Sequence, residues 1–313
     1  MKKVLVTEAL HPVFYERMHT AGVATELLAD GADVQQLINS MHSVQGLALR
    51  GRFRIGAELM DKAPVLQVIG RAGSGLELID LEAARQRNII CLNSPEGNCD
   101  SVAEHAIGML LLLMHQLRKA DAELRQGIFN RNGNWGNELK GKTVGIIGLG
   151  HTGGALARKL QNWGLTLLAV DPYRTEPWPS YVQQVEMPEL QARADVLSFH
   201  VPLTDETRGM ISRQWLQQLQ QRPIVVNAAR GGLAKTADLA DALQQNWIGG
   251  LCLDTFEEEA LGFEALSFQS PDLQRLSAHP QVVMTPHVAG WSQQSWEGIS
   301  AVLADKMLKV LLD

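Results

Sequence analysis

Short apolar runs alternate with helical patterns along almost the whole chain, and this alternation constrains the fold more than any other feature. The runs are rich in Val, Ile and Leu, as in "TVGIIG" and "IVVNA". Continuous apolar runs of this length are typical of strands buried on both faces, which occur in parallel sheets covered by helices. The sequence therefore predicts a doubly wound α/β fold. Its ten expected strands begin near Lys3, Gly46, Leu66, Ile89, Thr143, Leu165, Val196, Ile224, Gly250 and Val282.

The number of expected strands divides the chain into two sheets. Ten strands are many for one sheet, and 313 residues are enough for about two domains. We expect the break at residues 127–141, "GIFNRNGNWGNELKG", because this segment is rich in Gly and Asn and lacks a periodic apolar face. A long helix is expected just before it, from about Ser101 to Leu117.

The net charge and the cysteines limit the classes of partner. A formal net charge of −6 predicts no binding to nucleic acid or to an anionic membrane. The most apolar run, Ala106–Met114, is well short of the roughly 18 residues of a membrane span, and the N-terminus lacks the features of a secretory signal. Three cysteines without CxxC spacing indicate reduced, structural thiols and no metal site. We therefore expect a cytoplasmic protein.

The segment "TVGIIGLGHTGGALARKL" contains the pattern GxGxxG at Gly148, Gly150 and Gly153. An apolar run precedes the pattern and a helical pattern follows it, which is the context of a phosphate-binding turn. Gly148 permits the tight turn, Gly150 lets the backbone approach a pyrophosphate, and Gly153 lets helix and strand pack closely. The segment predicts a dinucleotide site at a helix N-terminus, with a purely structural glycine turn as the alternative.

An acidic residue, Asp171, ends the strand that follows this turn. It lies 21 residues after Gly150, close to the spacing of about 20 found in dinucleotide-binding folds. Its carboxylate would accept hydrogen bonds from the ribose hydroxyls and repel a 2′-phosphate. The sequence therefore predicts NAD as the cofactor in preference to NADP. Arg174 weakens this preference slightly, because a nearby Arg can accommodate the phosphate.

Three later strands end in polar groups. Arg230 follows "IVVNA", Asp254 and the glutamates 257–259 follow "GLCL", and His287 follows "VVMT". Each taken alone could be a surface or structural residue. Because ligands bind beyond the carboxyl ends of parallel strands, an Arg, an acid and a His at successive strand ends indicate a catalytic site.

Together these segments resemble the NAD-dependent D-2-hydroxyacid dehydrogenases, and most closely the 3-phosphoglycerate dehydrogenase branch. The resemblance covers nearly the whole chain, which makes chance similarity very unlikely. Its most specific pieces are "GRAGSG" (Gly70–Gly75), "SPEGNCDSVAEHAIGMLLLL" (Ser94–Leu113), "GKTVGIIGLG" (Gly141–Gly150), "HVPLTDETRGMI" (His200–Ile211), "NAARGG" (Asn227–Gly232) and "TPHVAGW" (Thr285–Trp291).

The resemblance implies two doubly wound parallel-sheet domains. A Rossmann NAD-binding domain would comprise residues 99–290, and a discontinuous flavodoxin-like substrate domain would comprise residues 1–98 and 291–313. The cleft between the domains is expected to close over the ligand and exclude water. Homodimers are usual in the family, with the helix around Ser101–Leu117 and the loop after it at the interface.

The resemblance also implies roles for individual residues. Arg230 corresponds to the Arg that holds the substrate carboxylate and keto oxygen, and His287 corresponds to the general acid/base. Glu259 would pair with His287, whereas Glu257 and Glu258 would be exposed. The other implied cofactor contacts are Gly148, Gly150, His151, Thr152, Gly153, Asp171, His200, Val201, Pro202, Thr207, Ala228, Asp254, His287 and Gly290, with Asp254 at the nicotinamide end. The other implied substrate contacts are Arg50, Arg71, Ser74, Gly75 and Asn98.

The substrate is less well defined than the reaction. Arg50, Arg52 and Arg54 occupy alternate positions in "ALRGRFR" and would point the same way in an extended segment. With Arg71 they could bind a phosphate, as expected for 3-phosphoglycerate, or they could form a solvated basic edge. A glyoxylate or hydroxypyruvate reductase and a non-catalytic NAD(H)-sensing scaffold on the same fold remain as alternatives.

Overall fold

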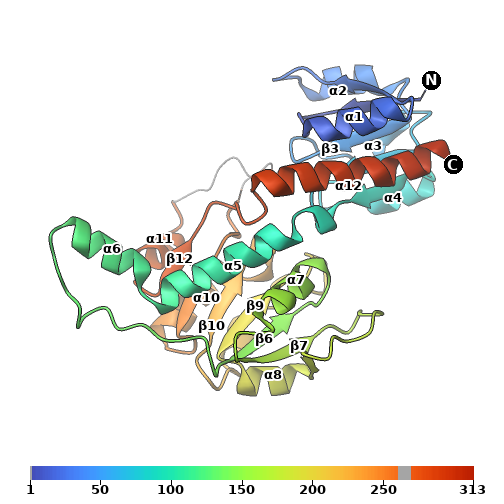
Figure 1. The fold of residues 1–313 in the computed structure, drawn as a ribbon. Helices are drawn as coiled ribbons and strands as arrows, with labels where there is room; N and C mark the ends of the chain where they lie inside the picture. Colours follow the sequence, from blue (N-terminus) through green and yellow to red (C-terminus); the bar gives the residue numbers. More distant parts are fainter. Residues whose placement is uncertain (1, 260–268) are drawn as a thin grey trace. The chain divides into compact units, whose positions relative to one another are not determined.

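The computed structural model describes residues 2–259 and 269–313, which form two compact units (Figure 1). Unit 1 comprises residues 2–99 and 291–313, and unit 2 comprises residues 100–259 and 269–290. Within the described residues, the chain passes from unit 1 to unit 2 after Cys99 and back to unit 1 after Gly290. No helix in the part of the chain that the structure describes is long and apolar enough to cross a membrane.

Unit 1 contains a five-stranded parallel sheet. Its strand order, β2-β1-β3-β4-β5, is the flavodoxin-like order. Val4 and Val6 pack in one buried cluster with Leu303 of α12, and Leu5 lies in a second cluster. The sheet is thus buried on both faces, which explains its continuous apolar runs. The strands are β1 (Lys3–Val6), β2 (Ala24–Leu27), β3 (Gly46–Leu49), β4 (Val68–Arg71) and β5 (Ile90–Asn93).

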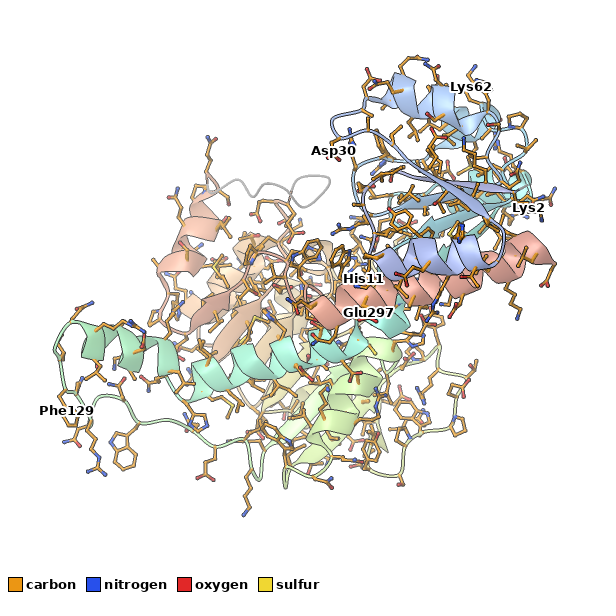
Figure 2. The ribbon with its side chains drawn as sticks, turned by 45° about the horizontal axis from the view of Figure 1, so that its top comes forward. Lys2, His11, Asp30, Lys62, Phe129 and Glu297 are labelled. Atoms are coloured by element: carbon orange, nitrogen blue, oxygen red, sulfur yellow. The ribbon has the colours of Figure 1, made fainter. Side chains whose placement is uncertain are left out.

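The helices of unit 1 come from both ends of the chain. The C-terminal helix, α12 (Gln293–Leu312), lies beside α1 (Pro12–Thr20), and both views show this (Figures 1 and 2). The methyl group of an alanine at Gly70 would lie 2.6 Å from Met307 Sδ, so β4 and α12 pack closely. The remaining helices are α2 (Val34–Met41), α3 (Ala57–Asp61), α4 (Leu81–Gln86) and the 3₁₀ turn η1 (Pro95–Gly97).

Unit 2 contains a seven-stranded parallel sheet in the order β12-β11-β10-β9-β6-β7-β8. The order reverses between β6 and β9, which is the switch point where doubly wound sheets bind ligands. The strands are β6 (Thr143–Ile147), β7 (Thr166–Val170), β8 (Gln183–Gln184), β9 (Val196–Phe199), β10 (Ile224–Asn227), β11 (Gly250–Leu253) and β12 (Val282–Met284). Both sheets confirm the predicted fold class.

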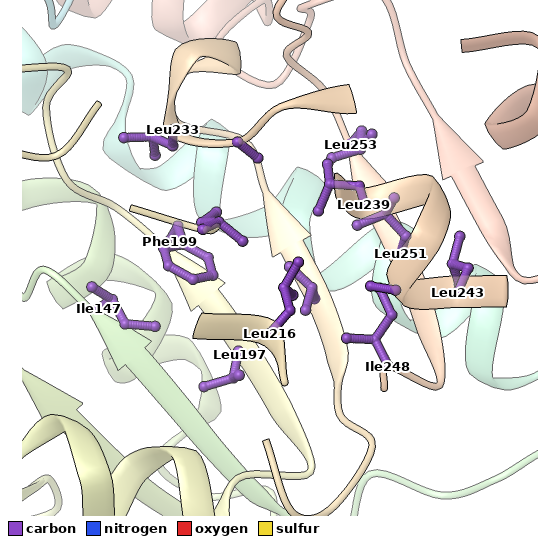
Figure 3. Packing of buried hydrophobic residues seen from close by; sticks show 14 of the residues in the cluster. Ile147, Leu197, Phe199, Leu216, Leu233, Leu239, Leu243, Ile248, Leu251 and Leu253 are labelled. Atoms are coloured by element: carbon purple, nitrogen blue, oxygen red, sulfur yellow. The ribbon is translucent and has the colours of Figure 1, made fainter. Parts of the chain in front are cut away.

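Buried apolar side chains hold α10 on the sheet of unit 2. Leu197, Phe199 and Leu251 of the strands pack with Leu239 and Leu243 of α10 (Figure 3). The helices are α5 (Cys99–Met114), which begins at the last residue of unit 1, α6 (Leu117–Arg125), α7 (His151–Leu160), α8 (Met187–Arg193), α9 (Arg213–Leu216), the 3₁₀ turn η2 (Gly231–Leu233), α10 (Thr236–Gln244) and α11 (Pro271–Ala278).

The structure contains all ten expected strands and two that the sequence did not predict. β2 is a half-exposed edge strand, "ATEL", without a continuous apolar run, and β8 is a two-residue edge strand of exposed glutamines. The first sheet ends before residues 127–141, as expected. This segment nevertheless lies within unit 2, because α5 and α6 precede it there. The expected long helix is interrupted at Gln116, whose φ of +52° is left-handed.

Candidate active site

The glycine turn after β6 lies at the switch point of the unit 2 sheet. Gly148 has a φ of +88°, and a Cβ atom there would lie 2.8 Å from the carbonyl oxygen of His200. A Cβ atom at Gly153 would lie 2.0 Å from the carbonyl oxygen of Gly148, so only glycine fits at both positions. A Cβ atom at Gly150 would meet open space, which leaves this backbone accessible to a ligand.

The first turn of α7 fits a pyrophosphate. Gly150 is the N-cap and makes no side-chain hydrogen bond to this helix end. The first N–H groups of a helix bind anions well, because they lack intrahelical partners. The predicted cofactor contacts His151 and Thr152 lie in this first turn, with His151 exposed and Thr152 half-buried.

Asp171 follows β7 and is hydrogen-bonded to the glycine turn. Its carboxylate accepts hydrogen bonds from the N–H groups of Leu149 (2.8 Å) and Tyr173 (3.1 Å). Arg174, which could have accommodated a 2′-phosphate, instead donates to the carbonyl oxygens of Leu149 (2.6 Å) and Pro177 (2.8 Å). The acid therefore lies beside the turn, and two of the arginine's donors are directed to backbone.

The loop after β9 packs against the same turn. His200 Nε2 lies 2.8 Å from Ser198 Oγ, and burial lowers the pKa of His200 to about 4. Its ring is therefore neutral at neutral pH. Thr207 donates to the carbonyl oxygen of Pro202 (2.6 Å), which closes the loop, and Val201 lies beside Gly148. Four predicted cofactor contacts therefore lie in one loop beside the glycine turn, namely His200, Val201, Pro202 and Thr207.

The low pKa of His200 predicts a pH dependence of stability. The unfolded ring has a pKa near 6.5, so the unfolded state binds the extra proton first as the pH falls. The contribution of the neutral ring is fully present above about pH 6.5 and is lost as the pH falls towards 4. The loss should be no more than about 3 kcal/mol, which corresponds to the shift of the pKa from 6.5 to about 4. Urea unfolding of wild type and His200→Asn at several pH values measures it, and identical pH dependence would contradict the assignment.

Glu259 and His287 form an ion pair or hydrogen bond at the carboxyl ends of β11 and β12. His287 Nδ1 lies 2.8 Å from Glu259 Oε2, with 23% and 14% of the two side chains exposed. The other carboxylate oxygen, Oε1, accepts a hydrogen bond from the Phe256 N–H (2.7 Å). This second bond fixes the orientation of the carboxylate. The pairing predicted from the family is therefore present.

Asp254 holds the backbone that carries His287. Its side chain is 0% exposed and accepts hydrogen bonds from the N–H groups of Val288 (2.9 Å) and Ala289 (2.8 Å). Thr285 Oγ1 donates to the same carboxylate at 2.5 Å. These bonds stabilise a turn in which His287 has a left-handed φ of +55°. Direct contact of Asp254 with a cofactor stays a prediction.

Glu257 and Glu258 correct one expectation. Glu257 is exposed but accepts a hydrogen bond from the Thr236 N–H (3.0 Å). Glu258 is half-buried and accepts one from Thr236 Oγ1 (2.8 Å). Thr236 is the first residue of α10, whose N-cap Lys235 offers no side-chain hydrogen bond. Glu257 therefore caps α10 from a neighbouring loop through a backbone N–H, and Glu258 bonds the hydroxyl of the same threonine. Glu257 is exposed as expected, whereas the expectation of an exposed Glu258 was wrong.

Arg230 lies in the loop after β10, next to the loop that carries Glu259. The Asn227 side chain, which is 1% exposed, accepts from the Ala229 N–H (3.1 Å) and donates to the Arg230 carbonyl oxygen (2.9 Å). A Cβ atom at Gly231 would lie 1.9 Å from the Phe256 carbonyl oxygen. Glycine at this position therefore lets the two loops touch. Ala228, in the same loop, and Gly290, at the end of unit 2, are half-buried.

The predicted substrate contacts of unit 1 cluster beyond β4. Ser74 Oγ donates to Asn98 Oδ1 (3.0 Å), which links two predicted contacts. Arg71 donates to the carbonyl oxygens of Arg50 (3.0 Å) and Gly75 (3.1 Å). Arg71 therefore supports the backbone of this loop.

Arg50 and Arg52 do not point the same way, although Arg71 bonds to the backbone of Arg50. Arg52 turns towards the Ala29 and Ala32 carbonyl oxygens, and Arg50 stacks over Trp291, with Cζ 4.5 Å from the ring centroid. The cause is a bend at residues 50–52, where three N–H groups donate to the Glu8 carboxylate. Burial alone would raise the pKa of Glu8, but these hydrogen bonds and one from Thr7 hold it below its usual value. The segment is bent rather than extended, so alternate residues do not share one side.

Sequence reasoning missed several residues that the structure places around the site. They lie within the recognised motifs but carry no charge of their own, or belong to a helix far away in the sequence. The missed residues are Ser101, His105, Asn227 and Thr285.

Among the described residues, no group of three or more His, Cys, Asp or Glu side chains could hold a metal ion.

Comparison with known proteins shows the family. Residues 107–289 match the model of the D-isomer specific 2-hydroxyacid dehydrogenase NAD-binding domain. The chain belongs to this family. It is 33% identical to the D-3-phosphoglycerate dehydrogenase of Archaeoglobus fulgidus over 310 residues. The aligned segment covers 98% of this chain and 57% of that protein. The Mycobacterium tuberculosis enzyme of the same name is 34% identical over 280 residues, 89% of this chain and 51% of that one. The chain thus spans about half the length of these relatives.

Solved structures of the family share the whole fold. The structure is similar to a glyoxylate/hydroxypyruvate reductase from Sinorhizobium meliloti described as NADPH-dependent, with a TM-score of 0.81, 29% identity and coverage of 98% and 92% of the two chains. It is also similar to a D-lactate dehydrogenase from Aquifex aeolicus complexed with NAD and lactic acid, with a TM-score of 0.82, 26% identity and coverage of 99% and 94%.

Proposed function

We propose that this chain is an NAD-dependent oxidoreductase that interconverts a D-2-hydroxy acid and the corresponding 2-keto acid. The observation that carries the proposal is the placement of the Glu259–His287 pair and Arg230 at adjacent strand ends of one sheet. The same sheet has the glycine turn and Asp171 at its switch point, and both fit NAD. Unit 2 would thus bind the cofactor, and unit 1 would supply the predicted substrate contacts Ser74, Gly75 and Asn98.

The residues fit the two requirements of keto-acid reduction. NADH, when bound, supplies the hydride to the carbonyl carbon. His287 in its charged form donates a proton to the carbonyl oxygen, and the Glu259 carboxylate stabilises that charge before transfer. Arg230 offers a planar fork to the substrate carboxylate and stabilises the negative charge that develops on the carbonyl oxygen. In the oxidation of a hydroxy acid, neutral His287 accepts the proton.

The cofactor assignment predicts the effect of removing Asp171. Wild type should prefer NAD(H) over NADP(H), because the carboxylate accepts from ribose hydroxyls and repels a 2′-phosphate. Asp171→Ala should narrow this preference by weakening NADH binding and relieving the repulsion. Values of kcat/KM for both cofactors measure the effect. Equal wild-type efficiency with both would contradict the assignment.

The substrate is tested by NADH oxidation against a panel of 2-keto acids. Phosphohydroxypyruvate belongs in the panel, because the relatives include D-3-phosphoglycerate dehydrogenases. Glyoxylate, hydroxypyruvate and pyruvate should be included as well, because the Arg52 and Arg71 side chains that could bind a phosphate donate to backbone carbonyl oxygens. Arg50→Ala should impair phosphohydroxypyruvate reduction far more than glyoxylate reduction if Arg50 binds the phosphate. Absence of turnover with every 2-keto acid would contradict the proposed function and favour an NAD(H)-sensing scaffold.

The three consecutive glutamates provide a matched test of the His287 partner. In Glu259→Gln, loss of the charge disfavours imidazolium, so keto-acid reduction should lose activity at a lower pH than in wild type. Glu257→Gln and Glu258→Gln should leave the pH profile unchanged. Their stability should fall by no more than about 1 kcal/mol, because the amide oxygen of Gln can still accept a hydrogen bond from Thr236. If Glu258→Gln shifts the pH–rate curve and Glu259→Gln does not, the assignment is wrong.

A homodimer is part of the proposal. The segment from α6 to residue 135 extends away from the sheet of unit 2, with Phe129 at its far end (Figures 1 and 2). Phe129 and Trp135 are 85% and 77% exposed, which is unusual for large apolar side chains. The family resemblance supports a second copy of the chain as the occupant of this surface. Light scattering should show a dimer for wild type and a monomer for Phe129→Ser with Trp135→Ser, whereas a monomeric wild type would refute the dimer.

A cytoplasmic location completes the proposal. None of the three cysteines, all of which the structure describes, is in a disulfide. Burial raises the pKa of the Cys91 thiol to about 11 and that of Cys252 to about 12, so neither is a reactive thiolate at neutral pH. Cysteines that are not in disulfides are typical of a reducing compartment. Cell fractionation tests the location.

A further inference from the structure

Helix α5 binds the turn that carries His287 at both of its ends. Ser101 Oγ donates to the carbonyl oxygen of Ala289 at 2.7 Å. His105 Nε2 lies 2.9 Å from Thr285 Oγ1. Ser101 and His105 are four residues apart and therefore share one face of the helix. The turn at residues 285–289 is thus bound by α5 on one side and by Asp254 on the other.

The single hydroxyl proton of Thr285 determines which atom donates in its hydrogen bonds to Asp254 and His105. Thr285 has one hydroxyl proton, and its contact with the Asp254 carboxylate, at 2.5 Å, is the shortest that it makes. A carboxylate only accepts, so this proton lies between Thr285 and Asp254. Thr285 Oγ1 is then the acceptor in its contact with His105, whose Nε2 must carry a proton. His105 therefore completes a chain of donors that ends on the buried carboxylate.

The turn needs this support for a physical reason. His287 has a left-handed backbone, which is unfavourable for a residue with a side chain and persists only where surrounding contacts hold it. Asp254 is 0% exposed, and His105 Nε2 lies 3.6 Å from its Oδ1 atom. A proton on this nitrogen thus also stabilises the buried charge.

We propose that Ser101 and His105 are positioning residues for the acid–base reaction of His287. They fix the two ends of its turn, so that the ring keeps its bond to Glu259 and its direction. This inference rests on the proposed function, because it assigns these residues to the same site. Neither residue is required to touch a ligand.

The test compares His105→Leu, which removes the donor, with His105→Gln, whose amide N–H can replace it. His105→Leu should lower kcat for keto-acid reduction by roughly 10- to 100-fold, because small displacements of a catalytic group have effects of this size. NADH binding, measured by fluorescence, should be unchanged. His105→Gln should stay within about threefold of wild type. Glu104→Gln, on the same helix but paired with Lys159, is the matched control and should behave as wild type.

Two further measurements separate positioning from a purely structural role. The NMR resonance of the His287 ring and the pH–rate profile should both move in His105→Leu and return in His105→Gln, with Asp254 and Glu259 unchanged. Thr285→Val and Thr285→Ser, which remove and keep the hydroxyl, should repeat this pair of results if His105→Leu fails to fold. The NMR measurement needs no turnover, so it tests the inference even if the proposed function fails. Unchanged kcat and an unmoved ring resonance in His105→Leu or Thr285→Val would overturn it.

Discussion

Replacing His287 by Gln should reduce turnover of the 2-keto acid by on the order of 10²- to 10⁴-fold. The glutamine side chain has a similar reach but does not give up a proton near neutral pH. The Glu259 carboxylate would then have no imidazolium to stabilise, although its bond to the Phe256 N–H would remain. Stopped-flow measurement of a single turnover with NADH gives the loss in the chemical step directly.

Two controls define the result for His287. NADH binding should persist, because the glycine turn follows β6 and Asp171 follows β7. In the strand order of the sheet, both strands are well separated from β12, which His287 follows. His279→Gln is the matched substitution, since His279 precedes β12 whereas His287 follows it. This variant should retain wild-type turnover. Wild-type turnover in His287→Gln itself would remove this residue from the reaction.

Replacing Arg230 by Lys should lower kcat/KM by on the order of 10²- to 10³-fold while NADH still binds. A guanidinium presents two parallel N–H donors to a carboxylate, and an ammonium group is a point charge that does not reproduce this geometry. The loop itself should keep its shape, because Asn227 holds it through backbone groups, and a Lys ammonium can still donate to the Ala229 carbonyl oxygen that the Arg230 guanidinium binds at 2.6 Å.

The chain provides a matched control for Arg230 on the same strand. Arg222 precedes β10 and donates to the Asn246 side chain, whereas Arg230 follows the strand. Arg222→Lys makes the same chemical change at the opposite edge of the sheet and should leave kcat/KM unchanged. Equal losses in both variants would indicate a structural effect of replacing arginine. Full activity in Arg230→Lys would contradict its role.

Parts of the fold were predictable because they depend on local apolar patterns. The central strands are buried on both faces, so each appears in the sequence as a continuous apolar run. β2 and β8 were missed for the converse reason, since edge strands bury little and are held by backbone hydrogen bonds to a neighbour. Periodicity carries no signal for a strand of that kind.

Residue chemistry predicted part of the site in the same way. The sequence by itself determined the glycine turn, because Gly148 and Gly153 occupy positions where any Cβ atom would clash. It also placed Arg230, Glu259 and His287 at the ends of neighbouring parallel strands, where the sheet brings them to one edge. Residues required by their chemistry or by local geometry are visible in a sequence.

Only the tertiary structure decided which neighbours those residues have. Arg52 and Arg71 bond to backbone carbonyl oxygens, and Glu258 accepts a hydrogen bond from the Thr236 hydroxyl instead of facing solvent freely. The chain of hydrogen bonds from His105 through Thr285 to Asp254 joins three segments that are far apart in the sequence. Such hydrogen bonds depend on the position of backbone groups in a distant loop. The packing of helices and strands determines that position. Residue types and their spacing along the chain do not indicate the position of a distant loop.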